Sequence, residues 1–142
     1  MNVNKLVGAI VAAFLILFVA ELLVHGVWLA SAYRGMTAEG FLFRAQETMQ
    51  HKLWIVCVSD LLYSILFAWV YVRGTELKPW ASQGIRFGIL MWLFTVVPAS
   101  LNDYVIYSLH HMLVIKWLAA GFITLIVMGL AVAAILRSPT SA

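Results

Sequence analysis

The segment "ELLVHG", Glu21 to Gly26, places a carboxylate and an imidazole inside a long apolar run. Glu21 and His25 are four residues apart, so a helix presents both side chains on one face. A carboxylate close to an imidazole can move protons, hold a polar ligand or contribute to a metal site. This pair is the first candidate for chemistry in the chain.

Later apolar runs carry further polar side chains. Asp60 and Tyr63 lie about one turn apart on roughly the same side of a predicted helix. Asn102 and Asp103 follow near the end of a third run, and Lys116 lies near the start of a fourth. The candidate polar cluster consists of these seven residues: Glu21, His25, Asp60, Tyr63, Asn102, Asp103 and Lys116.

A metal or haem site is one alternative for part of this cluster. His25 with His110 or His111 could approach from opposite helices, as in a bis-histidine haem site, and Glu21 or Asp60 could join for zinc. No second histidine at helical spacing supports this interpretation. We therefore expect no metal or cofactor and keep haem or metal binding as a lesser hypothesis.

Other catalytic patterns are absent from the sequence. It contains no G-x-S-x-G, no phosphate-binding glycine loop, no C-x-x-C and no H-E-x-x-H. The sequence therefore favours a protein without enzymatic activity.

The composition shows which elements must position the polar residues. The chain of 142 residues is 64% hydrophobic and 11% charged, whereas soluble domains are about half apolar and about a quarter charged. Apolar runs at about 6–33, 53–72, 85–107 and 112–136 each reach the roughly 20 residues that span a bilayer. Short connections make successive helices antiparallel. We predict one all-α domain over residues 1–142, an integral membrane, up-down-up-down four-helix bundle.

The basic residues predict its orientation. An even number of spans places both termini on one side, and that side carries more lysine and arginine, so the termini are expected in the cytoplasm. The basic residues of that side are Lys5, Arg73, Lys78, Arg86 and Arg137. Because they are dispersed at helix ends and form no basic run, we do not expect nucleic acid as a partner.

This orientation brings the ionisable residues of the spans together in the outer half of the bundle. Insertion scales give a cost of about 2.5 to 3.5 kcal/mol for Asp, Lys or Arg at the centre of a membrane helix. We therefore expect Glu21, His25 and Asp60 to face the bundle interior. The cluster is then either structural, with Glu21 bonded to His25 or a tyrosine and Asp60 paired with Lys116 or a hydroxyl, or a functional pocket.

Small residues predict where helices approach closely. Gly84 and Gly88 begin the third span, and Gly121 and Gly129 recur along the fourth. Such spacing lets membrane helices approach closely, because no hydrophobic effect drives helices together in lipid. The sequence does not determine which helices meet through them.

The first outer connection, "TAEGFLFRAQETMQHK", has apolar residues at helical spacing. Phe41, Leu42, Ala45 and Met49 would form one face. We predict a short amphipathic helix on the membrane surface, with Thr37 as its N-cap.

The patterns "ELLVHGVWLASAY" and "GIRFGILMWLFTVVPASLNDY" resemble those of a loose group of small four-span bacterial membrane proteins that carry no assigned activity. The resemblance extends over most of the chain. It implies a multi-pass protein of the bacterial inner membrane, and it transfers no catalytic residue.

Three functional hypotheses follow for so small a chain with little mass outside the bilayer. The leading one is an accessory or scaffolding subunit of a membrane complex, with a membrane protein partner or a homo-oligomer. The first alternative is a proton-linked carrier or small-ligand-binding protein that uses Glu21, His25 and Asp60. The second is the haem- or metal-binding protein.

Overall fold

The computed structural model describes residues 2–38, 40, 46–76 and 78–137. Within these residues the chain is helical and contains no strand. Four of the described helices are long and apolar enough to cross a membrane, over Val3–Trp28, Thr48–Arg73, Trp80–Ile106 and His111–Leu136. The predicted all-α four-helix fold is therefore confirmed, and the chain is a multi-pass membrane protein.

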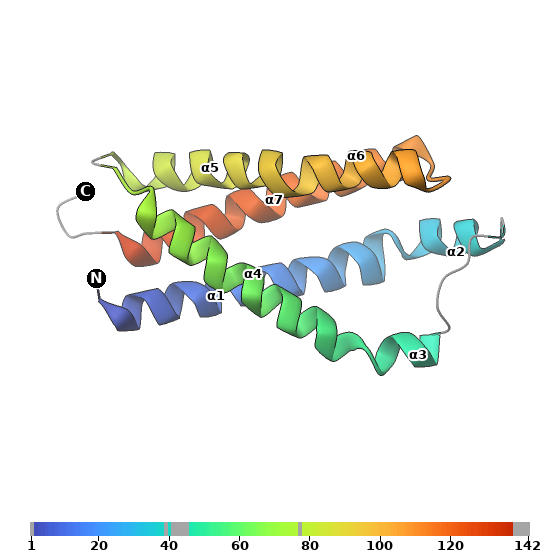
Figure 1. The fold of residues 1–142 in the computed structure, drawn as a ribbon, viewed down its shortest axis with the longest axis horizontal. Coiled ribbons are helices and arrows are strands. Elements are labelled where there is room, and N and C mark those ends of the chain that lie inside the picture. The colour runs from blue at the N-terminus through green and yellow to red at the C-terminus, as the bar shows by residue number, and fades with distance from the viewer. Residues whose placement is uncertain (1, 39, 41–45, 77, 138–142) are drawn as a thin grey trace.

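The four spans alternate in direction (Figure 1). The first consists of α1 (Val3–Leu23) and a π-helical turn, η1 (Val24–Trp28), and the second is mainly α4 (Leu53–Arg73). The third joins α5 (Trp80–Met91), a second π-helical turn η2 (Trp92–Val96) and α6 (Val97–Ile106), and the fourth is α7 (His111–Leu136). The start of α1 and the end of α7 lie together at one end of the bundle, which we call the end of the termini (Figure 1). We call the half next to this end the termini half and the other half the far half.

The first span is interrupted where the sequence predicted a continuous helix to residue 33. The backbone N–H of Leu29 donates to the carbonyl of Val24 at 2.8 Å, a five-residue step that widens the turn. Helix α2 (Ala30–Ala38) then begins after this break. Gly26 lies within the widened turn, and glycine is a weak helix former.

The third span begins earlier than the apolar run suggested, at Trp80 rather than residue 85. Pro79 is the N-cap residue of α5, which suits a residue that has no backbone N–H to donate. The Gln83 side chain donates to the carbonyls of Glu76 and Lys78, at 2.7 Å each, and so fixes the preceding connection. Gln83 itself lies in α5, so the helix begins before the apolar segment does.

The predicted surface helix is only partly described. Phe41, Leu42 and Ala45 lie outside the described residues, and Met49 lies in the short helix α3 (Gln46–Gln50). Thr37 is not an N-cap: it lies in the last turn of α2, where its hydroxyl donates to the carbonyl of Tyr33 at 3.0 Å.

Helices α5 and α7 meet backbone to backbone in the termini half. A Cβ built on Gly84 would lie 2.7 Å from the carbonyl oxygen of Gly129, and one on Gly88 would lie 2.5 Å from that of Leu125. Both distances are shorter than side chains tolerate. The glycines of these two helices therefore permit a contact that no larger residue would allow.

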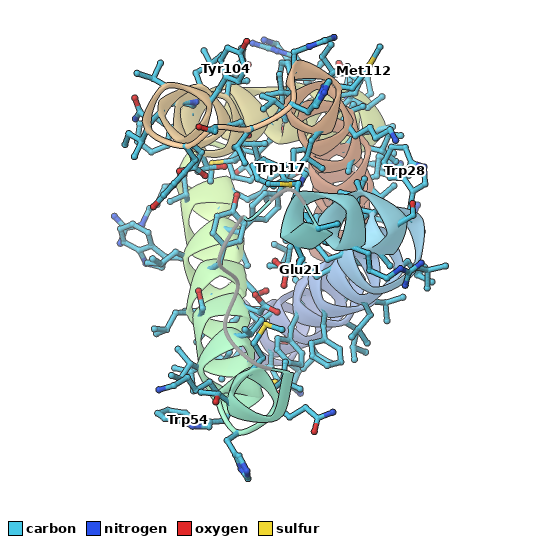
Figure 2. All side chains as sticks on the ribbon, turned by 90° about the vertical axis from the view of Figure 1, so that its right-hand side faces the viewer. Glu21, Trp28, Trp54, Tyr104, Met112 and Trp117 are labelled. Carbon is cyan, nitrogen blue, oxygen red and sulfur yellow. The ribbon has the colours of Figure 1, made fainter. Side chains whose placement is uncertain are left out.

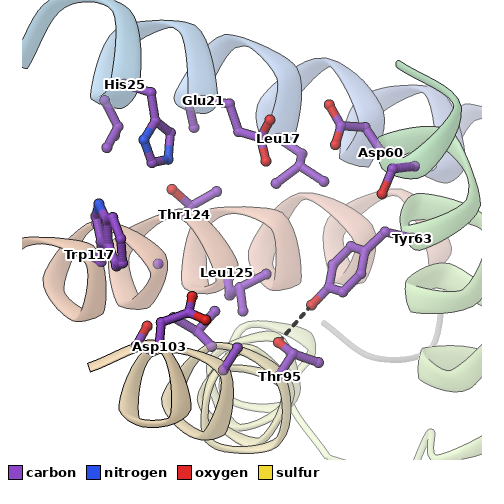
Figure 3. Close-up of a pocket in the computed structure, with 18 residues that line it drawn as sticks. Leu17, Glu21, His25, Asp60, Tyr63, Thr95, Asp103, Trp117, Thr124 and Leu125 are labelled. Atoms are coloured by element: carbon purple, nitrogen blue, oxygen red, sulfur yellow. Dashed lines mark hydrogen bonds between the residues drawn. The ribbon is translucent and has the colours of Figure 1, made fainter. Parts of the chain in front are cut away.

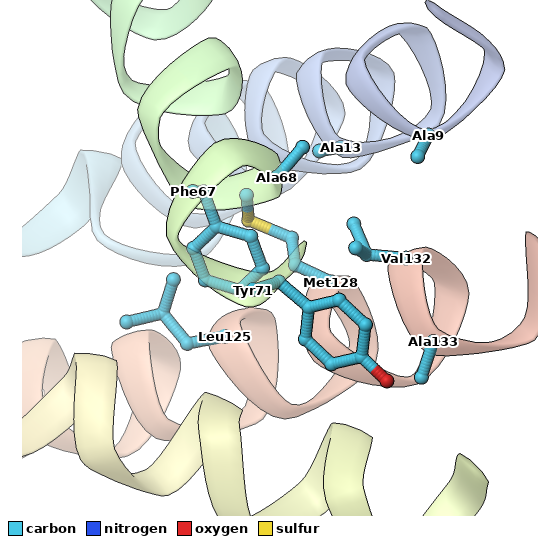
Figure 4. Packing of buried hydrophobic residues seen from close by; sticks show 9 residues of the cluster. All are labelled: Ala9, Ala13, Phe67, Ala68, Tyr71, Leu125, Met128, Val132 and Ala133. Atoms are coloured by element: carbon cyan, nitrogen blue, oxygen red, sulfur yellow. The ribbon is translucent and has the colours of Figure 1, made fainter. Parts of the chain in front are cut away.

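The termini half also contains the main hydrophobic core (Figure 4). Phe87 of α5 packs edge-on against Phe67 and Tyr71 of α4, with ring centroids 4.7 and 5.3 Å apart. Helix α4 crosses the bundle obliquely (Figure 1), so this dense packing is confined to one half. The buried residues of the core are Ala9, Ala13, Phe67, Ala68, Tyr71, Leu125, Met128, Val132 and Ala133.

Candidate functional site

The far half of the bundle contains an open cavity of about 560 Å³ between the four spans (Figure 3). Viewed from the far end, Glu21 points into the space that the spans surround (Figure 2). The wall combines apolar side chains with a set of polar ones. The polar lining residues are Glu21, His25, Ser59, Asp60, Tyr63, Thr95, Ser100, Asp103 and Thr124.

Two carboxylates face each other from α1 and α4 at one side of this cavity. Glu21 is half-buried and Asp60 is 4% exposed. They are near enough for their charges to interact, and Figure 3 shows both side chains directed into the space between their helices. When both groups are ionised they repel each other, so this arrangement costs free energy unless a proton or a cation lies between them.

The Asp60 carboxylate is also incompletely hydrogen-bonded. Its Oδ2 atom is buried and has no hydrogen-bond partner among the described residues. The same holds for the hydroxyl of Ser64, one turn further along α4. A buried polar atom without a partner costs about 1–3 kcal/mol, and a charged one costs more.

Tyr63 presents an acceptor to the cavity. The hydroxyl of Thr95 donates to the carbonyl of Met91 at 2.7 Å, which uses its single proton. At the 3.2 Å contact between the two hydroxyls, Tyr63 must therefore be the donor and Thr95 the acceptor. The phenol oxygen retains lone pairs, and no proton, for a ligand.

His25 is bonded away from Glu21. Its Nδ1 atom lies 2.6 Å from the hydroxyl of Tyr33, with the two rings stacked. The indole N–H of Trp117 donates to the same hydroxyl at 2.9 Å. Tyr33 therefore connects η1, α2 and α7, and the Trp117 indole lines the cavity with its N–H already engaged.

Two members of the predicted cluster are not in the cavity wall. Asn102 is exposed, and the Lys116 ammonium lies over the ring of Trp28, 5.8 Å from its centroid. The described residues show no Asp60–Lys116 ion pair, so that proposed pairing is wrong. Both residues lie near helix ends, and the long Lys116 side chain can reach the polar interface there at little cost.

The candidate metal ligands do not converge in the described part of the chain. His110 and His111 are exposed neighbours with ring centroids 5.4 Å apart, and His25 binds Tyr33. No group of three or more His, Cys, Asp or Glu side chains within the described ranges is placed to hold a metal ion.

Several lining residues are not members of the candidate polar cluster. Thr124, Gly121 and Trp117 recur at helical spacing on one face of α7, and that periodicity was the available signal. Both π-helical turns border the cavity through His25 and Thr95. Such turns are frequent at functional sites, and Gly26 and Pro98 mark their positions in the sequence.

Helix α6 supplies the remaining acidic group. Asp103 is half-buried in the wall, on the opposite side of the cavity from Asp60 (Figure 3). The acidic groups are thus distributed around the cavity rather than gathered at one point.

Comparison with known proteins provides no family for this chain: no family model, no curated protein and no solved structure matches it.

Proposed function

We propose that this chain is a small-ligand-binding membrane protein whose site is the far-half cavity. The observation that carries the proposal is the Asp60 carboxylate, which lines the cavity and whose Oδ2 atom is buried without a partner among the described residues. A carboxylate that served only to join helices would be expected to have its hydrogen bonds completed by the chain, because half-satisfied buried networks destabilise a fold. A ligand that binds this carboxylate from the cavity would offset that cost and account for its retention.

The dimensions of the cavity support the same proposal. Its volume of about 560 Å³ lies inside the roughly 300–1,000 Å³ range of small-molecule sites. The wall is mostly apolar with a few polar groups, which is typical of sites that orient a small ligand. The packed core of the termini half adjoins the cavity at Leu125, which belongs to both.

The predicted orientation assigns a side to the opening. With cytoplasmic termini, as the distribution of basic residues favours, the far half faces outward. For a bacterial inner-membrane protein, as the resemblance suggests, a ligand would then enter from the periplasm. Proton-linked transport would additionally require an inward-open state.

Cysteine labelling tests whether the cavity admits and binds small molecules. In a Cys57→Ala background, Thr124→Cys places a thiol in the cavity wall and Val132→Cys places one in the core, on the same helix and with similar side-chain volumes. Thr124→Cys should react much faster with a membrane-impermeant maleimide added to intact cells. A library of cationic, neutral and anionic metabolites should contain compounds that slow the labelling of purified protein.

Two results would contradict the proposal. Equal labelling rates for Thr124→Cys and Val132→Cys in purified protein would show that the cavity is not open to small molecules. A reactive Thr124→Cys that no compound of any charge protects would show an open space without a binding site. Labelling only from the cytoplasmic side would instead overturn the orientation.

The accessory-subunit hypothesis remains a competing prediction and differs in its outcome. An accessory subunit should purify with a stoichiometric membrane partner, and substitution of Glu21 and Asp60 by Gln and Asn should leave that complex assembled and active. For a ligand-binding protein the same double substitution should abolish protection of Thr124→Cys. The haem or metal hypothesis predicts Soret absorbance or a stoichiometric metal in the purified protein.

A further inference from the structure

We infer that the ligand of this cavity is a small organic cation, such as an alkylammonium ion, held by Glu21, Asp60 and Asp103. This inference rests on the proposed function and specifies its ligand class. It follows from the charges of the wall, from its hydrogen-bonding capacity and from the distribution of its acidic groups.

Apart from the His25 imidazole, the ionisable groups of the wall are acidic. Glu21, Asp60 and Asp103 line the cavity, and no lysine or arginine is among the described lining residues. The ammonium of Lys116 is engaged outside it by the Trp28 ring. In a low-dielectric interior such a set of carboxylates attracts a cation and repels an anion.

Two hydrogen-bond donors of the wall are already engaged within the chain. The Tyr63 hydroxyl donates to Thr95, and the Trp117 N–H donates to Tyr33, so neither has a proton to offer a ligand. The Asp60 carboxylate, whose Oδ2 has no partner among the described residues, accepts hydrogen bonds when the group is ionised. A ligand that donates hydrogen bonds, as an ammonium does, completes what the chain leaves open.

The distribution of the carboxylates favours an organic ion over a bare metal ion. Glu21 and Asp60 lie together, whereas Asp103 lies across the cavity from Asp60 (Figure 3). The described residues provide no three-ligand metal group, and the apolar wall suits an alkyl or aryl body. The Trp117 ring adds an aromatic surface that attracts cations.

A cation also removes the strain between the two neighbouring carboxylates. Repulsion between ionised Glu21 and Asp60 falls when a positive charge lies between them. A neutral or anionic ligand cannot do this. Binding of a cation should therefore stabilise the folded protein as well as occupy the site.

The experiment compares ligands of matched shape on the purified protein. Butylammonium, butanol and butanoate share a chain and differ in the charge of the end group, and choline serves as a quaternary cation. Protection of Thr124→Cys from a neutral maleimide and titration calorimetry on the unmodified chain measure binding. We expect binding by butylammonium or choline, and at least about tenfold weaker binding by butanol and butanoate.

Charge-removing variants locate the interaction. Glu21→Gln, Asp60→Asn and Asp103→Asn should each weaken cation binding by about tenfold or more. Glu76→Gln, which removes an exposed carboxylate in the α4–α5 connection, should leave it unchanged. Far-UV circular dichroism identifies any variant that fails to fold, and the other two then decide the result.

The outcomes separate this inference from the proposed function. Equal or tighter binding of butanol or butanoate would overturn the cation assignment while leaving a ligand-binding cavity in place. Cation binding that all three cavity variants retain would overturn the assigned carboxylates. Absence of binding by every probe, together with an unreactive Thr124→Cys, would remove both proposals.

Discussion

Gly88→Ala adds one methyl group where α5 approaches the backbone of α7. The new Cβ would lie 2.5 Å from the carbonyl oxygen of Leu125 and 2.8 Å from the Cα atom of Ile126. Both neighbours are main-chain atoms of a continuous helix, so neither can rotate away as a side-chain end can. The clash is therefore relieved only when the two helices move apart.

The size of that movement sets the expected loss of stability. Ordinary contact begins at 3.4 Å, so the Leu125 oxygen must retreat by about 0.9 Å. A gap of about 0.5–1 Å forfeits a quarter to a half of each attractive contact, and overpacking typically costs about 1–3 kcal/mol. Alanine regains at most about 1 kcal/mol through helix propensity. We expect a net loss of about 1–2 kcal/mol in unfolding free energy.

The assay is titration of the detergent-solubilised protein with sodium dodecyl sulfate, followed by far-UV circular dichroism. Gly8→Ala is the matched control within a span, because its Cβ would meet only Ile135 Cγ2, at 3.8 Å. This variant should be as stable as the parent or slightly more so. If Gly88→Ala unfolds at the same detergent fraction as Gly8→Ala, the close contact of α5 with α7 is refuted.

Three further predictions use the same titration. Tyr33→Phe removes the hydroxyl that binds His25 and Trp117, so it should lower the unfolding free energy by about 0.5–1.5 kcal/mol for each hydrogen bond lost; an unchanged midpoint would contradict this. Asp60→Asn should stabilise the unliganded protein by about 1 kcal/mol, because an amide is less costly than an unpaired buried carboxylate; a large loss would mean that the chain satisfies the carboxylate. The hydrogen bond and charge of Lys78 lower the pKa of Glu76 below its ordinary value of 4.5, so the stabilisation is present above that value and lost as the pH falls through the folded-state pKa. The parent should therefore lose more stability than Glu76→Gln below about pH 4.5, and parallel pH profiles would argue against a stabilising Lys78 contact.

The fold was predictable because the bilayer constrains the length and the hydropathy of every helix that crosses it. A helix that crosses lipid needs a continuous apolar segment, and short connections between such segments leave only antiparallel neighbours. The interruption at Leu29 did not follow from this rule, because a π-helical turn retains its hydrogen bonds and changes no hydropathy. The start at Trp80 was missed because Ser82 and Gln83 continue a helix outside the apolar window.

Depth in the bilayer explains which candidate residues line the cavity. Glu21 and Asp60 lie well within their spans, where a charge that faced lipid would cost several kcal/mol, so the sequence alone indicates an inward side chain. Asn102 and Lys116 lie near span ends, where that cost vanishes and position says little about direction. The bond from His25 to Tyr33 depends on the widened turn between them, which no periodicity encodes.

Helix α7 takes part both in the glycine contact with α5 and in the wall of the cavity. Leu125 presents its carbonyl to Gly88 and also lines the cavity. Gly121, one turn earlier, meets Val96 of η2, and both residues lie in the cavity wall. Since the glycine contact fixes the separation of α5 and α7 in the termini half, it also fixes the position of the wall that α7 and η2 form in the far half. The rigid half thereby holds the carboxylates of α1 and α4 against a defined opposite wall, which a site for a small ion requires.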